Sequence, residues 1–276
     1  MTISTNPLVQ LNYASLELLN DKSFSTQIFG WLSSEERKRY KRFVNKQQAN
    51  QYLLARALLR SQLSARVPSV LPQQWVFVID DSGKPRLADE FSYLNFRFNL
   101  SHSEDLVVLA LGDGLGGRLN LGVDVECIHR SVFSMTLAKR YFAKTELAYL
   151  MRLTEKQQVK RIAQLWTLKE SYLKASGLGL RMPLAKLEFC FEGEYGLDFS
   201  ISSSWAEPLP AEDSSFISLF SLGPDYSLAL TIEADKPMNT SAMTITEWTG
   251  LNNLLLGLPC ELLRKTVSQK FSHNSL

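Results

Sequence analysis

The chain has 276 residues, of which 45% are hydrophobic and 21% charged, and its formal net charge is +2 at pH 7. It is long enough to bury one large core or two smaller ones. The nearly balanced charge does not favour a nucleic-acid binder. The cysteines number three and lie far apart, which argues against a disulfide framework and a zinc site. Without a signal peptide or a membrane-length apolar run, the chain is expected to be cytoplasmic.

The first half of the chain is predicted to contain helices followed by strands. Residues 33–66 have apolar side chains at helical spacing and predict one or two helices, with Ser33 or Ser34 as the N-cap. A strand is expected at 75–80, and the alternating residues 96–111 predict two strands around a polar bend. A glycine-rich stretch then leads into a further strand near 121–126.

The second half repeats this order of helices followed by strands. Residues 134–153 and 155–176 are predicted to be helical. Short strands are expected at "KLEFCF", "LDFSIS", "SFISLFSL" and "YSLALTIEA", and an amphipathic helix around 251–267. The pattern favours an α+β fold divided near the glycines. We expect an N-terminal subdomain at 1–117, a C-terminal subdomain at 118–236 and an extension of open role at 237–276.

Two acids interrupt an apolar strand in "LGVDVECIHR" (121–130). Side chains alternate along a strand, so Asp124 and Glu126 share one face, about 7 Å apart at their Cα atoms. Like charges this close raise each other's pKa unless a positive group lies between them. A solvated strand face and a cation site are both open at this point.

A third acid lies in the helix predicted at 155–176. Glu170 precedes Lys174 by one turn, and Trp166 precedes Glu170 by one turn. One interpretation is a surface ion pair worth a few tenths of a kcal/mol. The other is that Glu170 joins Asp124 and Glu126 as an oxygen ligand, a set that Mg²⁺ favours. Spacing alone does not decide between them.

Three stretches of the chain resemble the signature motifs of one enzyme family. They are "FNLSHS" (98–103), "GVDVE" (122–126) and "WTLKESYLK" (166–174). In order and separation they closely resemble the motifs of the 4′-phosphopantetheinyl transferases, in the larger Sfp-type form. The similarity runs from about residue 30 to about residue 235, and it includes "SGKPRL" (82–87), "LLARALLR" (53–60) and "RYFAKTELAYL" (140–150).

The resemblance implies a fold and an activity. The fold would be two similar α+β subdomains related by a pseudo-twofold axis, in a monomer. The enzyme would transfer 4′-phosphopantetheine from coenzyme A to a serine of an apo acyl or peptidyl carrier protein domain, releasing 3′,5′-ADP. Mg²⁺ would be the cofactor and coenzyme A the co-substrate. Neither nucleic acid nor membrane would be a partner. The pathway that supplies the carrier stays open among fatty-acid, polyketide, polyunsaturated fatty-acid and nonribosomal-peptide systems.

The resemblance also implies roles for individual residues. Asp124, Glu126 and Glu170 would hold Mg²⁺, Glu170 or Glu126 would be the general base, and Lys174 would act beside the leaving group. Coenzyme A would be bound by Arg39, Arg56, Lys84, Pro85, Ser101, His102 and Lys174. Arg60 is a further candidate. Glu36 stands where some members of the family carry a phosphate-binding lysine, and Lys38 and Lys41 are the neighbouring cations that would compensate.

Two other functions compete with the transferase. A Mg²⁺-dependent phosphohydrolase would use the same acids, and a non-catalytic module would bind a carrier protein or nucleic acid through the basic stretch "RKRYKR" (37–42). Lys174 and "NLSHS" favour phosphate binding with transfer, because a hydrolase requires neither.

Overall fold

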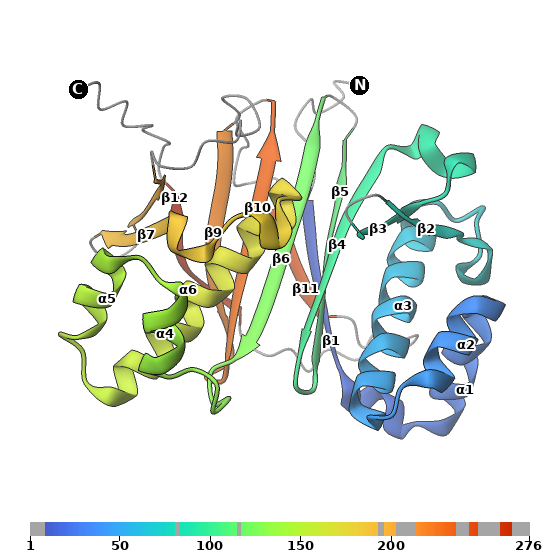
Figure 1. Cartoon of the computed structure of the whole chain (residues 1–276). Helices are drawn as coiled ribbons and strands as arrows, with labels where there is room; N and C mark the ends of the chain where they lie inside the picture. Colours follow the sequence, from blue (N-terminus) through green and yellow to red (C-terminus); the bar gives the residue numbers. More distant parts are fainter. Residues whose placement is uncertain are drawn as a thin grey trace. The chain divides into compact units, whose positions relative to one another are not determined.

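The fold is taken from a computed structural model of the chain (Figure 1). The structure describes residues 9–80, 83–114, 117–192, 196–202, 214–235, 243–247 and 260–266. These residues form two compact units, one from Met1–Gly116 with Asn239–Leu258 and the other from Gly117–Met238 with Pro259–Leu276. Each unit combines a sheet with helices, which confirms the predicted α+β fold; the pseudo-twofold relation stays a prediction.

The first unit contains three helices and the strands of two small sheets. Its helices are α1 (Lys22–Trp31), α2 (Ser34–Arg42) and α3 (Lys46–Arg66). Its strands are β1 (Val9–Ser15), β2 (Phe77–Ile79), β3 (Pro85–Leu87), β4 (Phe96–Ser103), β5 (Leu106–Asp113) and β11 (Met243–Glu247). Short 3₁₀ turns lie at Leu16–Asn20, Pro72–Gln74 and Asp89–Leu94.

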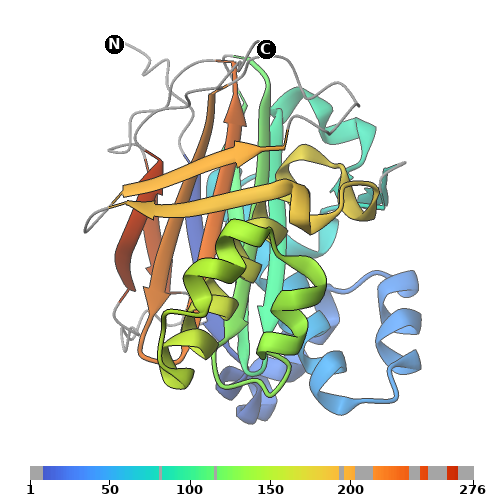
Figure 2. The same cartoon turned by 60° about the vertical axis from the view of Figure 1, so that its left-hand side comes forward.

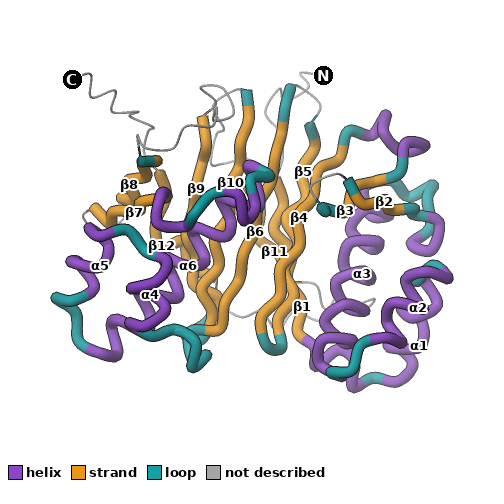
Figure 3. Tube along the Cα trace, viewed as in Figure 1, coloured by secondary structure: helices purple, strands orange, loops and turns teal. Residues whose placement is uncertain are grey.

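In the first unit the main sheet has the order β11-β1-β5-β4, and β2 pairs with β3 separately. The core lies between this sheet and the helices on one side of it (Figure 3). Leu54, Leu58 and Leu59 of α3 pack there with Val107 and Leu109 of β5. Helix α2 begins at Ser33, whose side chain accepts from Glu36 N while Glu36 Oε2 accepts from Ser33 N. This capping box explains why a helix starts at that residue.

The second unit contains three more helices and a larger sheet. Its helices are α4 (Met135–Tyr141), α5 (Lys144–Leu150) and α6 (Glu155–Ser176). Its strands are β6 (Leu119–Cys127), β7 (Leu187–Glu192), β8 (Gly196–Ile201), β9 (Ser214–Leu222), β10 (Tyr226–Ala234) and β12 (Cys260–Thr266). 3₁₀ turns lie at Gly179–Arg181 and Leu184–Lys186.

The sheet of the second unit has the order β6-β10-β9-β12-β8-β7. Strands β6, β10 and β9 are antiparallel neighbours, and the β7–β8 hairpin runs across the direction of β9 and β10 in Figure 2. Helix α6 packs on β6 and β10, and it ends at Gly177, whose φ of 69° is the left-handed conformation typical of a helix C-terminus.

Helix α6 and strand β6 approach each other closely at one glycine. A Cβ atom on Gly122 would lie 1.9 Å from Ser171 O and 2.4 Å from Ala175 N. Both neighbours are backbone atoms of α6, so only a residue without a side chain lets the two elements meet at this distance. Beside this contact the Ser171 and Thr231 hydroxyls lie 2.9 Å apart, which joins α6 to β10 as well.

One sequence-based helix prediction was wrong and another missed a break. The stretch 134–153 is helical as expected but is divided between α4 and α5, because Glu146 Oε2 accepts from Ala143 N and begins a new helix there. Of the helix expected around 251–267, Cys260–Thr266 form β12, which pairs with β9 and β8, and residues 248–259 lie outside the described residues. The described part of 237–276 thus supplies one strand to each unit's sheet.

Among the described residues, no helix has the length and apolar character that crossing a bilayer requires.

A side chain at Gly122 should separate α6 from β6. We expect Gly122→Ala to lower the free energy of unfolding by at least ~1–3 kcal/mol, because backbone atoms cannot rotate out of the way. The matched control is Gly30→Ala in α1, where a Cβ meets nothing within 4 Å. That change should stabilise the protein by ~0.5–1 kcal/mol. Urea unfolding measures both, and an unaltered midpoint in Gly122→Ala would contradict the close contact.

Candidate active site

The two acids of β6 point to the face of the sheet that α6 covers. Asp124 lies opposite Ala229 and Glu126 opposite Ser227 of β10, in register with Gly122 opposite Thr231. Because alternate residues of a strand share a face, Asp124 and Glu126 lie on the side that Gly122 presents to α6. Asp124 is buried and Glu126 is largely buried.

Each of these carboxylates has its own cation in the structure. Lys174 Nζ of α6 lies 2.7 Å from Asp124 Oδ1 and donates to Val123 O at 3.0 Å. Arg130 Nη1 lies 2.6 Å from Glu126 Oε2. The repulsion that the alternation of acids implies is therefore relieved by one lysine and one arginine.

The turn after β6 places Arg130 over the end of its own strand. Arg130 N donates to Cys127 O at 3.3 Å, and Ile128 N donates to Asp225 O at 2.8 Å in the β9–β10 turn. The His129 ring also contacts Asp225, with Nε2 2.8 Å from Oδ1. The position of Arg130 thus follows from a turn that backbone and side-chain bonds hold. Sequence reasoning did not single out this arginine, and no local motif marks it.

Glu170 of α6 is the third acid of the group. Burial raises the pKa of its carboxyl group, and the negative charges of Asp124 and Glu126 raise it further, while the Lys174 charge lowers it. The interaction of all three acids shows that strand and helix bring them into one region of the second unit. Burial beside two further acids therefore disfavours the ionised form of Glu170.

The donor set suits a hard divalent cation. Three carboxylates supply the oxygen ligands that Mg²⁺ prefers, and a cation would relieve the charge that raises the pKa of Glu170. Within the part of the chain that the structure describes, no group of three acidic, histidine or cysteine side chains converges closely enough to hold a metal ion. Binding would therefore require the carboxylates to turn from their present partners toward the ion.

His102 and Ser101 lie on β4 of the first unit, in the stretch "FNLSHS". Their side chains leave opposite faces of the strand, since Ser101 is buried and His102 exposed. The β4–β5 turn is bound to α3, because Gln51 Nε2 donates to Glu104 O at 2.7 Å. His102 shares the α3 side of β4 with Phe98, whose ring meets Phe77 edge to face.

The arginines of α3 differ sharply in their surroundings. Arg60 is fully buried, bonds to Pro72 O and Trp75 O, and pairs with Glu36 at 2.5 Å. The same Glu36 lies 3.4 Å from Arg56 Nε. Arg60 is therefore a core residue with no side-chain surface for a phosphate. Arg56 Nη1 has no acceptor among the described residues, so it keeps a donor for an anion.

The remaining basic candidates lie nearer the surface of the first unit. Arg39 of α2 is exposed, and its guanidinium lies over the Tyr52 ring, as does that of Arg56. Pro85 begins β3, and Lys84 precedes it in a turn where Lys84 N donates to Asp80 Oδ1 at 2.9 Å. Lys38 pairs with Glu35 at 2.7 Å. The chain's proposed phosphate-binding and acidic residues thus divide between its two units, apart from Lys174.

Two family models match the chain. The 4′-phosphopantetheinyl transferase superfamily matches residues 120–229, and the 4′-phosphopantetheinyl transferase N-terminal model matches residues 21–112. The 4′-phosphopantetheinyl transferase HetI of Nostoc is 34% identical over 194 residues, which cover 70% of this chain and 74% of that protein. The chain belongs to the 4′-phosphopantetheinyl transferase superfamily.

One further relative agrees with this assignment. The transferase Sfp of Bacillus subtilis is 28% identical over 206 residues, covering 74% of this chain and 83% of Sfp. A solved holo-(acyl-carrier-protein) synthase of Bacillus anthracis, in complex with coenzyme A (3′,5′-ADP), is 18% identical with a TM-score of 0.34. The matched region covers 42% of this chain and 96% of the synthase chain. The membership that "GVDVE" and "WTLKESYLK" predict is confirmed.

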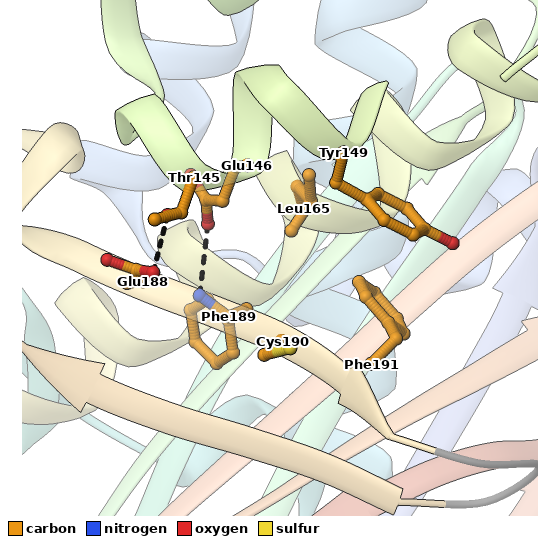
Figure 4. Close-up of a pocket in the computed structure, with 8 residues that line it drawn as sticks. All are labelled: Thr145, Glu146, Tyr149, Leu165, Glu188, Phe189, Cys190 and Phe191. Carbon is orange, nitrogen blue, oxygen red and sulfur yellow. Dashed lines mark hydrogen bonds between the residues drawn. The ribbon is translucent and has the colours of Figure 1, made fainter. Parts of the chain in front are cut away.

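The second unit also holds a small pocket away from the three acids. It has a volume of about 70 Å³ and lies between α5 and β7, lined by Thr145, Glu146, Tyr149, Leu165, Glu188, Phe189, Cys190 and Phe191 (Figure 4). Ligand sites for molecules of drug size measure roughly 300–1,000 Å³. This pocket is too small for coenzyme A, but Glu146 at its wall belongs to a charged group that sequence reasoning missed.

Removing Lys174 should destabilise this transferase. Asp124 would remain buried without its ammonium partner, so we expect Lys174→Met to cost at least ~1–3 kcal/mol. Adding Asp124→Asn to the Lys174→Met variant removes the unpaired buried carboxylate. This second change should restore more than half of the lost free energy of unfolding. Urea unfolding of both single variants and the double variant measures the coupling, and additive losses would contradict the pair.

Replacing Glu170 by Gln should stabilise the protein at neutral pH. A folded-state pKa raised above the ordinary 4.5 means that the folded state binds the proton more tightly, so ionised Glu170 opposes folding once the pH exceeds that value. The advantage of Glu170→Gln should therefore grow as pH rises from about 4.5 to the raised pKa and vanish below that range.

The exposed Glu35 provides a control of opposite sign. The hydrogen bond and charge of Lys38 lower the pKa of Glu35, so Glu35→Gln should lose stability above pH 4.5 and not gain it. Melting temperatures of both variants and the parent between pH 4 and 8 test whether the two substitutions shift stability in opposite directions. A parent-like profile for Glu170→Gln would contradict the described environment.

Proposed function

We propose that the chain transfers the 4′-phosphopantetheine group of coenzyme A to a serine hydroxyl of an acyl or peptidyl carrier protein domain, with Mg²⁺ and with release of 3′,5′-ADP. Membership of the superfamily supports the reaction. The single observation that carries the site assignment is the group of three interacting acids with Lys174, built by β6 and α6.

The three acids would hold the metal. Asp124, Glu126 and Glu170 are the ligands we propose, with water and coenzyme A phosphate oxygens in the remaining positions. When bound, Mg²⁺ supplies neutralisation of the charge on the phosphate oxygens and alignment of the reacting groups. The raised pKa of Glu170 supports this proposal, because it arises from burial and from the charges of Asp124 and Glu126, and a divalent cation would offset the part due to these acids.

The reaction needs a proton acceptor and a stabilised leaving group. The serine oxygen forms a bond to the β-phosphorus, the bond from that phosphorus to the bridging oxygen breaks, and the hydroxyl proton passes to a base. Glu170 suits this role better than Glu126, because its pKa is raised toward working pH while Glu126 is paired with Arg130. Lys174 would leave Asp124 to stabilise charge on the departing phosphate.

The first unit would bind the nucleotide part of coenzyme A. Its proposed contacts are Arg39, Arg56, Lys84, Pro85, Ser101 and His102. The exposed side chain of His102 and the unused donor of Arg56 favour contact with the 3′-phosphate, since charge-assisted bonds to phosphate are among the strongest polar contacts. A monomer that acts alone on its carrier is part of this proposal.

The test is transfer to purified apo carrier domains from fatty-acid, polyketide and nonribosomal-peptide systems, with coenzyme A and Mg²⁺. Intact mass should show the gain of one phosphopantetheine group, and chelation should abolish it. Dephospho-coenzyme A should be a weaker substrate by about tenfold or more, as expected for a lost contact of ~1.5–3 kcal/mol. His102→Ala should narrow that preference while Lys22→Ala, on the exposed surface of α1, should not.

The other outcomes identify the competing functions. Coenzyme A cleaved without modification of any carrier would indicate a phosphohydrolase. Binding of a carrier or of nucleic acid without any cleavage would indicate a non-catalytic module. Equal use of coenzyme A and its dephospho form would contradict the assignment of His102 to the 3′-phosphate.

A further inference from the structure

The second unit contains a fully buried ion pair outside the acidic group. Lys169 Nζ of α6 lies 2.9 Å from Glu146 Oε2 of α5, and both side chains are at most 1% exposed. The Phe142 and Phe189 rings flank the ammonium group at 5.3 and 6.0 Å from their centroids. The pair therefore lies inside the apolar core that α5, α6 and β7 share.

Every strong bonding position of this pair is used. Glu146 Oε2 also accepts from Ala143 N at 2.9 Å, and Oε1 accepts from Phe189 N at 3.0 Å (Figure 4). Lys169 also donates to Leu184 O at 3.0 Å and to Leu187 O. An ammonium group has three protons, and here they meet three acceptors. The network fixes one point of α6 to the start of α5 and to the chain entering β7.

Stability alone does not account for such a pair. Burial raises the pKa of Glu146 and lowers that of Lys169, so removal from water acts against both charges. Well-packed apolar residues in place of a buried ion pair are often as stable or more stable. The charged and directional bonds of Glu146 and Lys169 instead give α6 a defined position, because these bonds would break if the helix rotated or slid along its axis.

That defined position lies next to Glu170 in the chain. Adjacent residues of an α-helix are about 100° apart around its axis, so Lys169 points into the core while Glu170 points toward the acids of β6. On the β6 side, α6 is located by the Gly122 contact and by Lys174. Contacts on a single side leave the helix able to roll, and Lys169 supplies a fixed point on another side.

We infer that Glu146 and Lys169 are positioning residues that hold the rotation of α6, and so place the Glu170 carboxylate for metal binding and proton transfer. The inference rests on the proposed function of Glu170. A misplacement of about 1 Å at a reacting group is enough to lower a rate by about a hundredfold.

The deciding variant replaces the pair by apolar residues, Glu146→Leu with Lys169→Met. We expect a melting temperature unchanged or raised. Single-turnover transfer at saturating coenzyme A should fall at least about tenfold, with unchanged affinity for coenzyme A. Electron paramagnetic resonance of Mn²⁺, used in place of Mg²⁺, should show metal affinity weakened at least about fivefold, because Glu170 is one of the proposed ligands.

The matched control breaks a different bond between the same elements. Thr145 Oγ1 donates to Glu188 Oε1, which joins α5 to β7 without touching α6 (Figure 4). Thr145→Val alone breaks this bond and keeps the Glu188 charge that acts on Lys169, so it should leave the rate and the Mn²⁺ affinity within twofold of the parent. If the transfer rate and the Mn²⁺ affinity fall in this control as well, the cause is weakened packing between α5 and β7. That result would overturn the inference.

A folded apolar double variant with parental rate and parental Mn²⁺ affinity would also overturn it. If that variant does not fold, Glu146→Asp keeps the charges and moves the carboxylate by one methylene. A rate and Mn²⁺ affinity each lowered at least threefold would support the positioning role, and parental values would refute it. The Mn²⁺ measurement needs no carrier, so it judges the pair even if the parent chain transfers nothing.

Discussion

The close contact of β6 with α6 is the constraint on which the rest of the second unit depends. Gly122 brings the strand against Ser171 O and Ala175 N, and this approach sets how far the acids of β6 lie from those of α6. A wider separation would remove Lys174 from Asp124 and would end the charge interactions of Glu170 with both strand acids. The arrangement of the acidic group in this unit therefore depends on a glycine at position 122.

Charge compensation is the second constraint, and the two units meet it differently. In the first unit Glu36 lies between Arg56 and Arg60, and Nη1 of Arg56 and Nε of Arg60 have no acceptor among the described residues. In the second unit Lys174 and Arg130 pair with two of the acids, and burial together with the charges of Asp124 and Glu126 raises the pKa of the third, Glu170. Arginine donors without acceptors suit an anion, and the grouped carboxylates of the second unit suit a cation.

Local sequence patterns predicted the elements that are stabilised locally. The helix begun at Ser33, the hairpin at 96–111 and the alternation around Asp124 follow from capping and periodicity, and they agree with the structure. Strand β12 was misread because its leucines also fit a helical period, and only pairing with β9 and β8 makes it a strand. At the site, the sequence indicates that Asp124, Glu126 and Glu170 could act together. It does not predict which cations pair with these acids. Arg130 depends on a turn bound to Asp225, and the burial of Arg60 depends on carbonyl groups of residues 72 and 75.

The stretch "WTLKESYLK" illustrates how helical geometry divides one motif between two tasks. Residues four apart share a face, so Glu170 and Lys174 both reach the strand acids. Lys169 is adjacent to Glu170 in sequence but about 100° away around the axis, and it therefore enters the core and meets Glu146. The same nine residues thus carry the groups proposed for chemistry and the group proposed to orient them. Exchanging residues 169 and 170 keeps the composition of this segment, but it would place a lysine among the acids and a carboxylate against Glu146.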